Sequence, residues 1–125
     1  FDRILIEQIK SMDGSKKIVY VVKEKPVIND ALKKDAEDCG IDETAEIVSS
    51  GSDAPGTVLS LCSEEFLSMY RKADMVISKG QGNFEALSGT NRPVFFLFMA
   101  KCPVIAKDIG CNVGDVILHY HRGRK

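Results

Sequence analysis

The sequence predicts an α/β fold, specifically a three-layer α/β/α Rossmann-like domain with a mainly parallel sheet. Three observations predict this class: short apolar runs alternate with helical patterns, those runs are rich in β-branched and aromatic residues, and polar loops with glycines follow them. Strands that alternate with helices are joined by right-handed crossovers, so neighbouring strands run parallel. A length of 125 residues fits one domain spanning residues 1–125.

The first predicted element is an amphipathic helix over residues 1–10, ended by the turn signal Asp13-Gly14. Its apolar face is formed by Phe1, Ile4, Leu5, Ile6 and Ile9. The helix begins at the first residue without a Ser, Thr, Asp or Asn cap, so its first-turn amides have no side-chain partner. We therefore interpret the chain as a piece of something longer.

Strands and helices then alternate along the chain. Apolar runs predict strands at residues 18–22, 45–50, 75–78 and 93–100, with a fifth at 115–121. The runs at 18–22 and 93–100 are apolar enough for strands covered on both faces. Helices are predicted over residues 31–39 before Gly40, behind a cap at Ser63, and over 83–87.

Three polar loops follow the first three strands: KPVINDA at residues 25–31, SGSDAPGT at 50–57 and SKGQGN at 78–83. In open parallel sheets, ligands bind outside the carboxyl ends of the strands, where such loops converge. We therefore expect the functional residues of this chain in these loops.

The SKGQGN loop has the features of an anion site. Gly80 and Gly82 allow backbone amides to approach a ligand closely, and Lys79 supplies a compact positive charge suited to a phosphate oxygen. Because Lys79 precedes the glycines, neither common nucleotide-binding glycine pattern applies. The alternative is a tight turn with a solvated Lys79, in which Asn83 caps the next helix.

The other two loops each allow two interpretations. In the first, Asn29 or Asp30 caps the following helix. Alternatively, the Asp30 carboxylate binds a hard cation such as Mg²⁺. In the second, Ser52 and Asp53 could bind a ligand, namely substrate hydroxyls or a metal-bound water. Alternatively, they belong to an ordinary turn.

Composition narrows the class of protein. A net charge of -1 provides no broad basic surface for nucleic acid, and no apolar run approaches the length of a membrane helix. The cysteines show no CxxC pair, which predicts buried free thiols and a cytoplasmic protein: Cys39, Cys62, Cys102 and Cys111. His119 and His121 lie two apart on a predicted strand and so share a face, and we expect a surface or terminal role for them.

The ordered segments VVKEKPVINDA, SSGSDAPGT, ADMVISKGQGNFEALS and FFLFMAKCPVIAKDIGCNVGDVIL closely resemble the metal-dependent damage-control phosphatase family, in its bacterial and archaeal branch. The resemblance covers nearly the whole chain. It implies a Rossmann-like domain that hydrolyses phosphate monoesters of small metabolites, such as damaged or surplus sugar phosphates and cofactor intermediates. It also implies a divalent metal cofactor, Mg, Mn, Co or Ni.

Residue by residue, the resemblance gives Asp30 as a metal-binding carboxylate and Lys79 as the phosphate-contacting lysine, and these two are the expected catalytic residues. The motif positions expected to line the same cleft are Asn29, Ser52, Asp53, Gly80, Gln81, Gly82 and Asn83.

One feature of the family is absent from this sequence. In its members, the helix that resembles FDRILIEQI follows an Asp-Asn-Ala-Gly-Glu segment that supplies further metal ligands, with a helical domain before it. We therefore expect a carboxyl-terminal portion of a phosphatase that is a poor catalyst alone and self-associates through exposed apolar surface. The alternative function is a non-catalytic anion- or nucleotide-binding α/β module.

Overall fold

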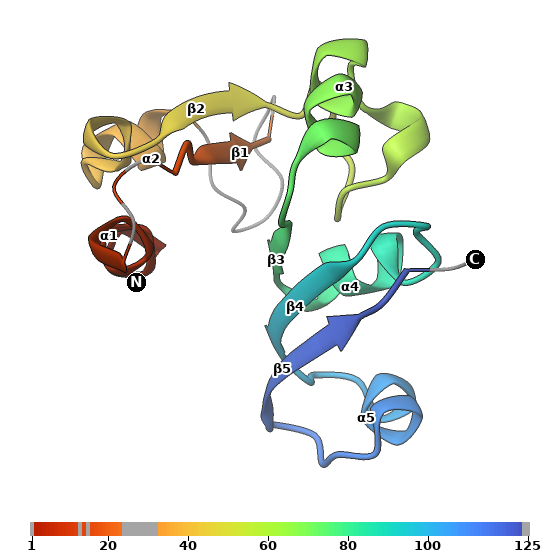
Figure 1. The fold of residues 1–125 in the computed structure, drawn as a ribbon. Helices are drawn as coiled ribbons and strands as arrows, with labels where there is room; N and C mark the ends of the chain where they lie inside the picture. Colours follow the sequence, from red (N-terminus) through yellow and green to blue (C-terminus); the bar gives the residue numbers. More distant parts are fainter. Residues whose placement is uncertain (1, 13, 15, 24–32, 124–125) are drawn as a thin grey trace. The chain divides into compact units, whose positions relative to one another are not determined.

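The computed structural model describes residues 2–12, 14, 16–23 and 33–123 of the chain (Figure 1). These residues form two compact units, Phe1–Asp53 and Ala54–Lys125. Each unit contains its own sheet and its own hydrophobic core. The strand pairings lie within the units, so the single central sheet expected from the sequence stays a prediction.

The first unit pairs two parallel strands, β1 (Val19–Val22) and β2 (Glu46–Ser49), with Val19 opposite Glu46 and Val22 opposite Ser49. Its helices are α1 (Asp2–Met12), α2 (Lys33–Asp38) and the short 3-10 helix η1 (Ile41–Glu43). Both predicted strands are confirmed, each with slightly narrower bounds. The core of this unit consists of Ile6, Val22, Ala36 and Ile41.

Helix α1 buries only part of its apolar face. Ile6 is buried, whereas Ile4 is 66% exposed and Leu5 is also exposed. The predicted amphipathic helix is confirmed, and its apolar face is only partly buried. Helical periodicity identifies the side of a helix that is apolar, and the neighbouring elements decide how much of that side is covered.

The second unit contains a three-stranded sheet in the order β3 (Ile77–Lys79), β4 (Val94–Met99) and β5 (Val116–His121). Strands β3 and β4 are parallel, and β5 runs antiparallel to β4. The helices are η2 (Leu59–Leu61), α3 (Glu64–Lys72), α4 (Gln81–Leu87) and α5 (Pro103–Ile109). Of the three strand pairs that the described residues form, two are parallel, and the mixed α/β fold class is confirmed.

Helix α3 begins as the sequence predicted. The Ser63 side chain accepts a hydrogen bond of 3.2 Å from the Phe66 N–H, and Glu64 and Glu65 occupy the first turn. At the other end, Arg92 donates hydrogen bonds to the carbonyls of Arg71 and Ala73. Both ends of the helix therefore have side-chain partners for backbone groups that the helix itself leaves unpaired.

Strand β4 supplies the centre of the second core. Val94, Phe96 and Phe98 are buried on one face, where the Phe84 ring of α4 lies 5.1 Å from Phe96 and 4.8 Å from Phe98, centroid to centroid. The sequence predicted a strand covered on both faces. Burial instead alternates along β4, ending at an exposed Met99.

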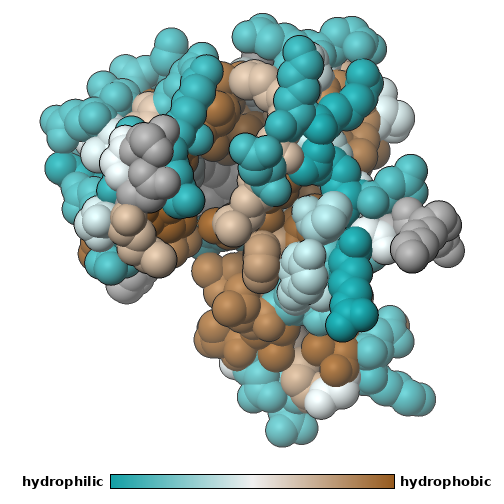
Figure 2. Space-filling view, in the orientation of Figure 1, coloured by the Kyte–Doolittle hydropathy of each residue, from teal (hydrophilic) through white to brown (hydrophobic). Residues whose placement is uncertain are grey.

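The opposite face of this sheet is also apolar. Its members on β4 and β5 are paired directly across the ladder: Phe95 with Tyr120, Leu97 with Leu118, and Met99 with Val116. The side chains of Val116 and Leu118 are 71% and 70% exposed. Hydrophobic side chains gather over β4 and β5 in Figure 2. Self-association through such a surface stays a prediction.

The histidines match their expected position, whereas the cysteines differ from expectation in their burial. His119 and His121 do share a face of β5, but that face is half-buried: His119 lies edge-on to Phe84, and His121 Nε2 is 2.9 Å from the Thr90 carbonyl oxygen. Both histidines are thus partly exposed on the last strand of the described chain, in keeping with the terminal position expected for them. None of the four cysteines forms a disulfide, but Cys39 is exposed and the other three are half-buried, so the predicted burial is wrong.

Candidate functional site

The SKGQGN loop leaves the sheet at the carboxyl end of β3. Lys79 is the last residue of this strand and lies opposite Leu97 of β4. Side chains alternate along a strand, so Lys79 is on the same face as Ile77 and opposite the buried Ser78. Lys79 is exposed. Since β3 and β4 are parallel, their carboxyl ends meet at one edge, where the sequence placed the site.

Gly80 makes the turn from strand to helix. Its φ of 93° lies in the region that favours glycine, and its N–H donates a 3.0 Å hydrogen bond to the Leu97 carbonyl. That N–H is thus paired within the sheet, although the sequence suggested it for an anion. The amides of Gln81, Gly82 and Asn83, in the first turn of α4, have no acceptor inside the helix.

Asn83 has a different position from the one the turn interpretation gave it. Helix α4 begins at Gln81 rather than near Asn83, and Gly80 occupies the capping position. Asn83 Oδ1 accepts a 2.8 Å hydrogen bond from the Thr57 hydroxyl, and Asn83 Nδ2 donates a 2.7 Å hydrogen bond to the Lys79 carbonyl. The side chain therefore connects two loops instead of capping the helix.

Gly56 and Gly82 bring these two loops into contact. A Cβ atom on Gly56 would overlap the Gly82 carbonyl oxygen and would lie 3.1 Å from the Ala86 Cβ. Gly56 also has a φ of 75°, so glycine is required there for both steric and conformational reasons. A Cβ on Gly82 would be 3.5 Å from the Gly56 nitrogen, which is ordinary van der Waals contact. The close approach thus depends on Gly56.

Gln81 links the site to the end of β4. Its Oε1 accepts a 2.7 Å hydrogen bond from the Lys101 N–H, and its Nε2 donates a 3.3 Å hydrogen bond to Glu85 Oε1. The side chain predicted to contact substrate is therefore already bonded within the protein. Its observed role is to hold the segment that leads from β4 into α5.

The remaining predicted site residues belong to the first unit. Ser52 is buried in a tight turn: its N–H donates to Ser50 Oγ at 3.3 Å, and Ser50 Oγ donates to the Ser52 carbonyl at 3.4 Å. Asp53 is exposed at the end of the same segment. Asn29 and Asp30 lie outside the described residues. The structure thus brings together residues 79–83, and the grouping of Asp30, Ser52 and Asp53 with them stays a prediction.

Thr57 and Lys101 were not identified from the sequence as site residues. Thr57 directly follows the proline and glycine of the SGSDAPGT loop. A hydroxyl next to a glycine in a loop that follows a strand was the signal that could have identified it. Lys101 takes part through its backbone N–H, for which no residue-type signal exists. Both were missed because their partners are distant in sequence.

The described residues do not themselves provide a metal centre. Among residues 2–12, 14, 16–23 and 33–123, no group of three or more His, Cys, Asp or Glu side chains is arranged to hold a metal ion. Asp30, the carboxylate predicted as a metal ligand, is outside these ranges.

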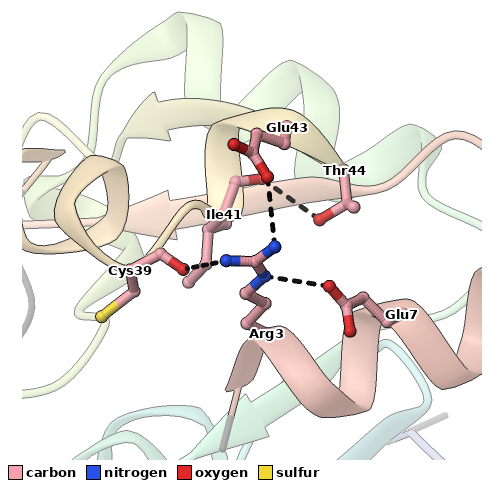
Figure 3. Close-up of polar contacts among 6 residues, drawn as sticks. All are labelled: Arg3, Glu7, Cys39, Ile41, Glu43 and Thr44. Carbon is pink, nitrogen blue, oxygen red and sulfur yellow. Dashed lines mark hydrogen bonds and ion pairs between the residues drawn. The ribbon is translucent and has the colours of Figure 1, made fainter.

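A separate polar cluster in the first unit is centred on Arg3 (Figure 3). Its guanidinium donates to Glu7 Oε1 at 2.9 Å, to Glu43 Oε2 at 3.1 Å and to the Cys39 carbonyl at 3.2 Å. The hydrogen bond with Glu7 and the charge of Glu7 raise the pKa of Arg3. With donors to three partners, this arginine ties α1 to the segment around η1.

Tyr20 of β1 makes a second polar contact with α1. Its hydroxyl donates a 2.6 Å hydrogen bond to Asp2 Oδ2. Burial raises the pKa of Tyr20 well above its ordinary value, and the hydrogen bond to Asp2 adds to this effect. The contact therefore fixes the protonated phenol in the folded state.

Comparison with known proteins decides the family. The model of the damage-control phosphatase ARMT1-like domain matches residues 1–117. The chain belongs to this family. It is 41% identical over 119 residues to a damage-control phosphatase of Pyrococcus horikoshii and 37% identical over 119 residues to one of Archaeoglobus fulgidus. It is also 46% identical over 122 residues to an uncharacterized protein of Methanocaldococcus jannaschii.

The family assignment extends to the three-dimensional structure. A crystal structure of a DUF89 family protein from Pyrococcus horikoshii matches with a TM-score of 0.90 and 38% identity, over 98% of this chain and 42% of that one. The alignment with each of these three relatives includes 94% of this chain but only 40% or 41% of the relative's own length. The chain thus spans about two fifths of the proteins it matches.

In the described part of the chain, no helix combines the length and apolar character that crossing a membrane requires.

Proposed function

We propose that this chain carries the phosphate-recognition part of a metal-dependent phosphatase that hydrolyses phosphate monoesters of small metabolites, such as damaged or surplus sugar phosphates and cofactor intermediates. The observation that carries the proposal is the position of Lys79 at the carboxyl end of β3, followed by a loop that hydrogen bonds fix on both sides. Membership in the damage-control phosphatase family supports the reaction class.

Lys79 is suited to the phosphoryl group of such a substrate. Its ammonium is a compact charge at the end of a flexible stem, and its backbone is fixed by strand pairing with β4 and by the Asn83 side chain. A cation held near the equatorial oxygens stabilises the charge that develops during phosphoryl transfer. We therefore assign Lys79 to orienting the substrate phosphate and stabilising its charge.

A divalent metal is part of the proposal, with Asp30 as its ligand in this chain; the candidates are Mg²⁺, Mn²⁺, Co²⁺ and Ni²⁺. When bound, such an ion neutralises phosphoryl charge and orients the ester. Asn29, Ser52 and Asp53 are proposed to line the same cleft. A small-molecule phosphate ester in the cytoplasm is the proposed partner.

The test is hydrolysis of p-nitrophenyl phosphate and several sugar phosphates with each of the four metals, comparing this chain with the longer Pyrococcus horikoshii relative. Lys79→Ala should reduce the rate by about 10²–10³-fold, which added metal does not restore. Asp30→Asn should weaken metal binding, so that excess metal restores part of the rate. Lys72→Ala, at an exposed lysine in the last turn of α3, is the matched control.

Two results would contradict the proposal. If Lys79→Ala and Lys72→Ala had equal rates, Lys79 would not be the phosphate-contacting residue. If this chain bound orthophosphate but neither it nor the longer relative hydrolysed any ester, the anion-binding module would be the better description.

A further inference from the structure

We propose that Thr57 is a positioning residue for Lys79 and acts through Asn83, an inference that rests on the proposed phosphate-binding role of Lys79. Thr57 lies 22 positions before Lys79 in the sequence, in the loop that precedes η2. Two hydrogen bonds connect them: the Thr57 hydroxyl to Asn83 Oδ1 at 2.8 Å, and Asn83 Nδ2 to the Lys79 carbonyl at 2.7 Å.

The chemistry of these groups fixes the direction of both hydrogen bonds. A backbone carbonyl only accepts, so the Lys79 carbonyl requires the NH2 end of the Asn83 amide. The oxygen end of that amide then faces Thr57, whose hydroxyl must donate. Without this hydroxyl, the amide can turn over, which would set its oxygen against the Lys79 carbonyl oxygen. Thr57 therefore selects the orientation in which Asn83 holds Lys79.

The Lys79 carbonyl is where such a restraint matters most. It belongs to the peptide bond that enters Gly80, whose φ is 93°. A Cβ atom built on Gly80 would meet no heavy atom within 4 Å, so packing against that position does not restrain the turn. The turn is held by hydrogen bonds instead: the Gly80 N–H to Leu97 on one side, and Asn83 to the Lys79 carbonyl on the other.

The contact between Gly56 and Gly82 explains why the Thr57 hydroxyl can reach the Asn83 side chain. Gly56 packs directly against the Gly82 backbone, which places the next residue of its loop beside the residue that follows Gly82. Thr57 and Asn83 are those two residues. Two glycine-containing segments, SGSDAPGT and KGQGN, are thus coupled through one hydroxyl and one amide.

The experiment compares Thr57→Val, which removes the hydroxyl, with Thr57→Ser, which keeps it. Thr44→Val is the matched control, because Thr44 is also half-buried and its hydroxyl also donates one hydrogen bond, to the Ile41 carbonyl in the first unit. Orthophosphate binding is measured by titration calorimetry well below the melting temperature. NMR follows the Lys79 carbonyl carbon and the Asn83 side-chain amide, which report the contact without any ligand.

We expect Thr57→Val to weaken orthophosphate binding by about 3- to 10-fold, the effect of losing roughly one neutral hydrogen bond. It should also shift the Lys79 carbonyl resonance and speed exchange of the Asn83 amide protons. Thr57→Ser should restore all three, and Thr44→Val should leave them at wild-type values. A general loss of stability would not be restored by serine at constant temperature.

An unchanged Lys79 carbonyl resonance and an unchanged affinity in folded Thr57→Val would overturn the inference. If Thr57→Val does not fold, Asn83→Asp serves instead, because it opposes a carboxylate to the Lys79 carbonyl while keeping an acceptor for Thr57. Wild-type affinity in Asn83→Asp would equally overturn it. If the wild type itself binds no orthophosphate, the proposed function fails, and the carbonyl resonance alone decides whether Thr57 positions Lys79.

Discussion

The two units of the molecule hold their parts together by different means. The second unit is built around a buried aromatic cluster in which Phe96 is fully shielded from water and Phe84 packs against it edge-on. In the first unit, the four buried core residues among those described are aliphatic, and α1 is attached partly through the polar contacts of Arg3 and Tyr20. Buried apolar area contributes far more stability than exposed ion pairs.

This difference bears on the loop that carries Lys79, whose geometry depends on the elements that support it. The loop that carries Lys79 follows β3, which pairs with the core strand β4, and hydrogen bonds to the Leu97 carbonyl and from the Asn83 side chain hold it there. Sites supported by packed strands keep their geometry better than sites on weakly packed segments. We therefore expect substitutions in the two units to differ in how much stability they cost and in how that cost depends on salt and pH.

The largest effect should come from Phe96→Ala. Removing this ring leaves a cavity among Val94, Phe84 and Phe98, and such truncations typically cost about 3–5 kcal/mol of unfolding free energy. Denaturant unfolding followed by circular dichroism measures the loss. Leu118→Ala, at a 70% exposed leucine on the neighbouring strand, is the control and should cost much less. Equal losses would contradict the assignment of the core to one face of β4.

Gly56→Ala should have the next largest effect. The residue must adopt a positive φ and its Cβ would overlap the Gly82 carbonyl, so we expect a loss of about 1–3 kcal/mol together with separation of the two loops. Gly82→Ala is the matched control: it meets ordinary contact distances and should gain up to about 1 kcal/mol from helix propensity. Thermal melting measures both, and a larger loss in Gly82→Ala would exclude the close approach described above.

Tyr20 should make the first unit sensitive to high pH. Its folded pKa is raised, so its contribution to stability is complete below the unfolded pKa of about 10 and is lost as the pH rises beyond that value. The unfolding free energy should therefore fall above pH 10. Tyr20→Phe should remove this part of the pH dependence and cost about 1 kcal/mol at neutral pH through the lost hydrogen bond to Asp2.

Unfolding measured from pH 7 to 11 tests the alkaline effect, with Tyr120→Phe as the control because Tyr120 is 49% exposed. If Tyr20→Phe retained the full alkaline loss, the raised pKa of Tyr20 would not be its cause.

The smallest effect should come from Arg3→Ala. Its ion pairs with Glu7 and Glu43 are exposed, so the difference in melting temperature from wild type should be small and should shrink as salt is added. Lys33→Ala, which removes an exposed pair with Glu37, is the control. A difference that is large and independent of salt would show that Arg3 stabilises α1 by packing or by its bond to the Cys39 carbonyl.

The sequence by itself determined helices α1 to α4 and the loop that carries Lys79, whereas helix α5 was not identified. The apolar runs predicted the five strands that the described residues form, the Ser63 cap predicted the start of α3, and the paired glycines marked the turn after β3. These features are local: strand propensity, capping and a positive φ each depend on a few neighbouring residues. The resemblance in the motifs likewise gave the family that the matched domain confirms.

Only the tertiary structure decided what the loop side chains do. Asn83 was expected as a cap or a substrate contact, but its partners Thr57 and Lys79 come from two different segments. The Gln81 side chain likewise accepts a hydrogen bond from a residue distant in sequence, the Lys101 backbone N–H. Hydrogen-bond partners distant in sequence depend on how close two backbones approach, and here the absence of a Cβ on Gly56 permits that approach.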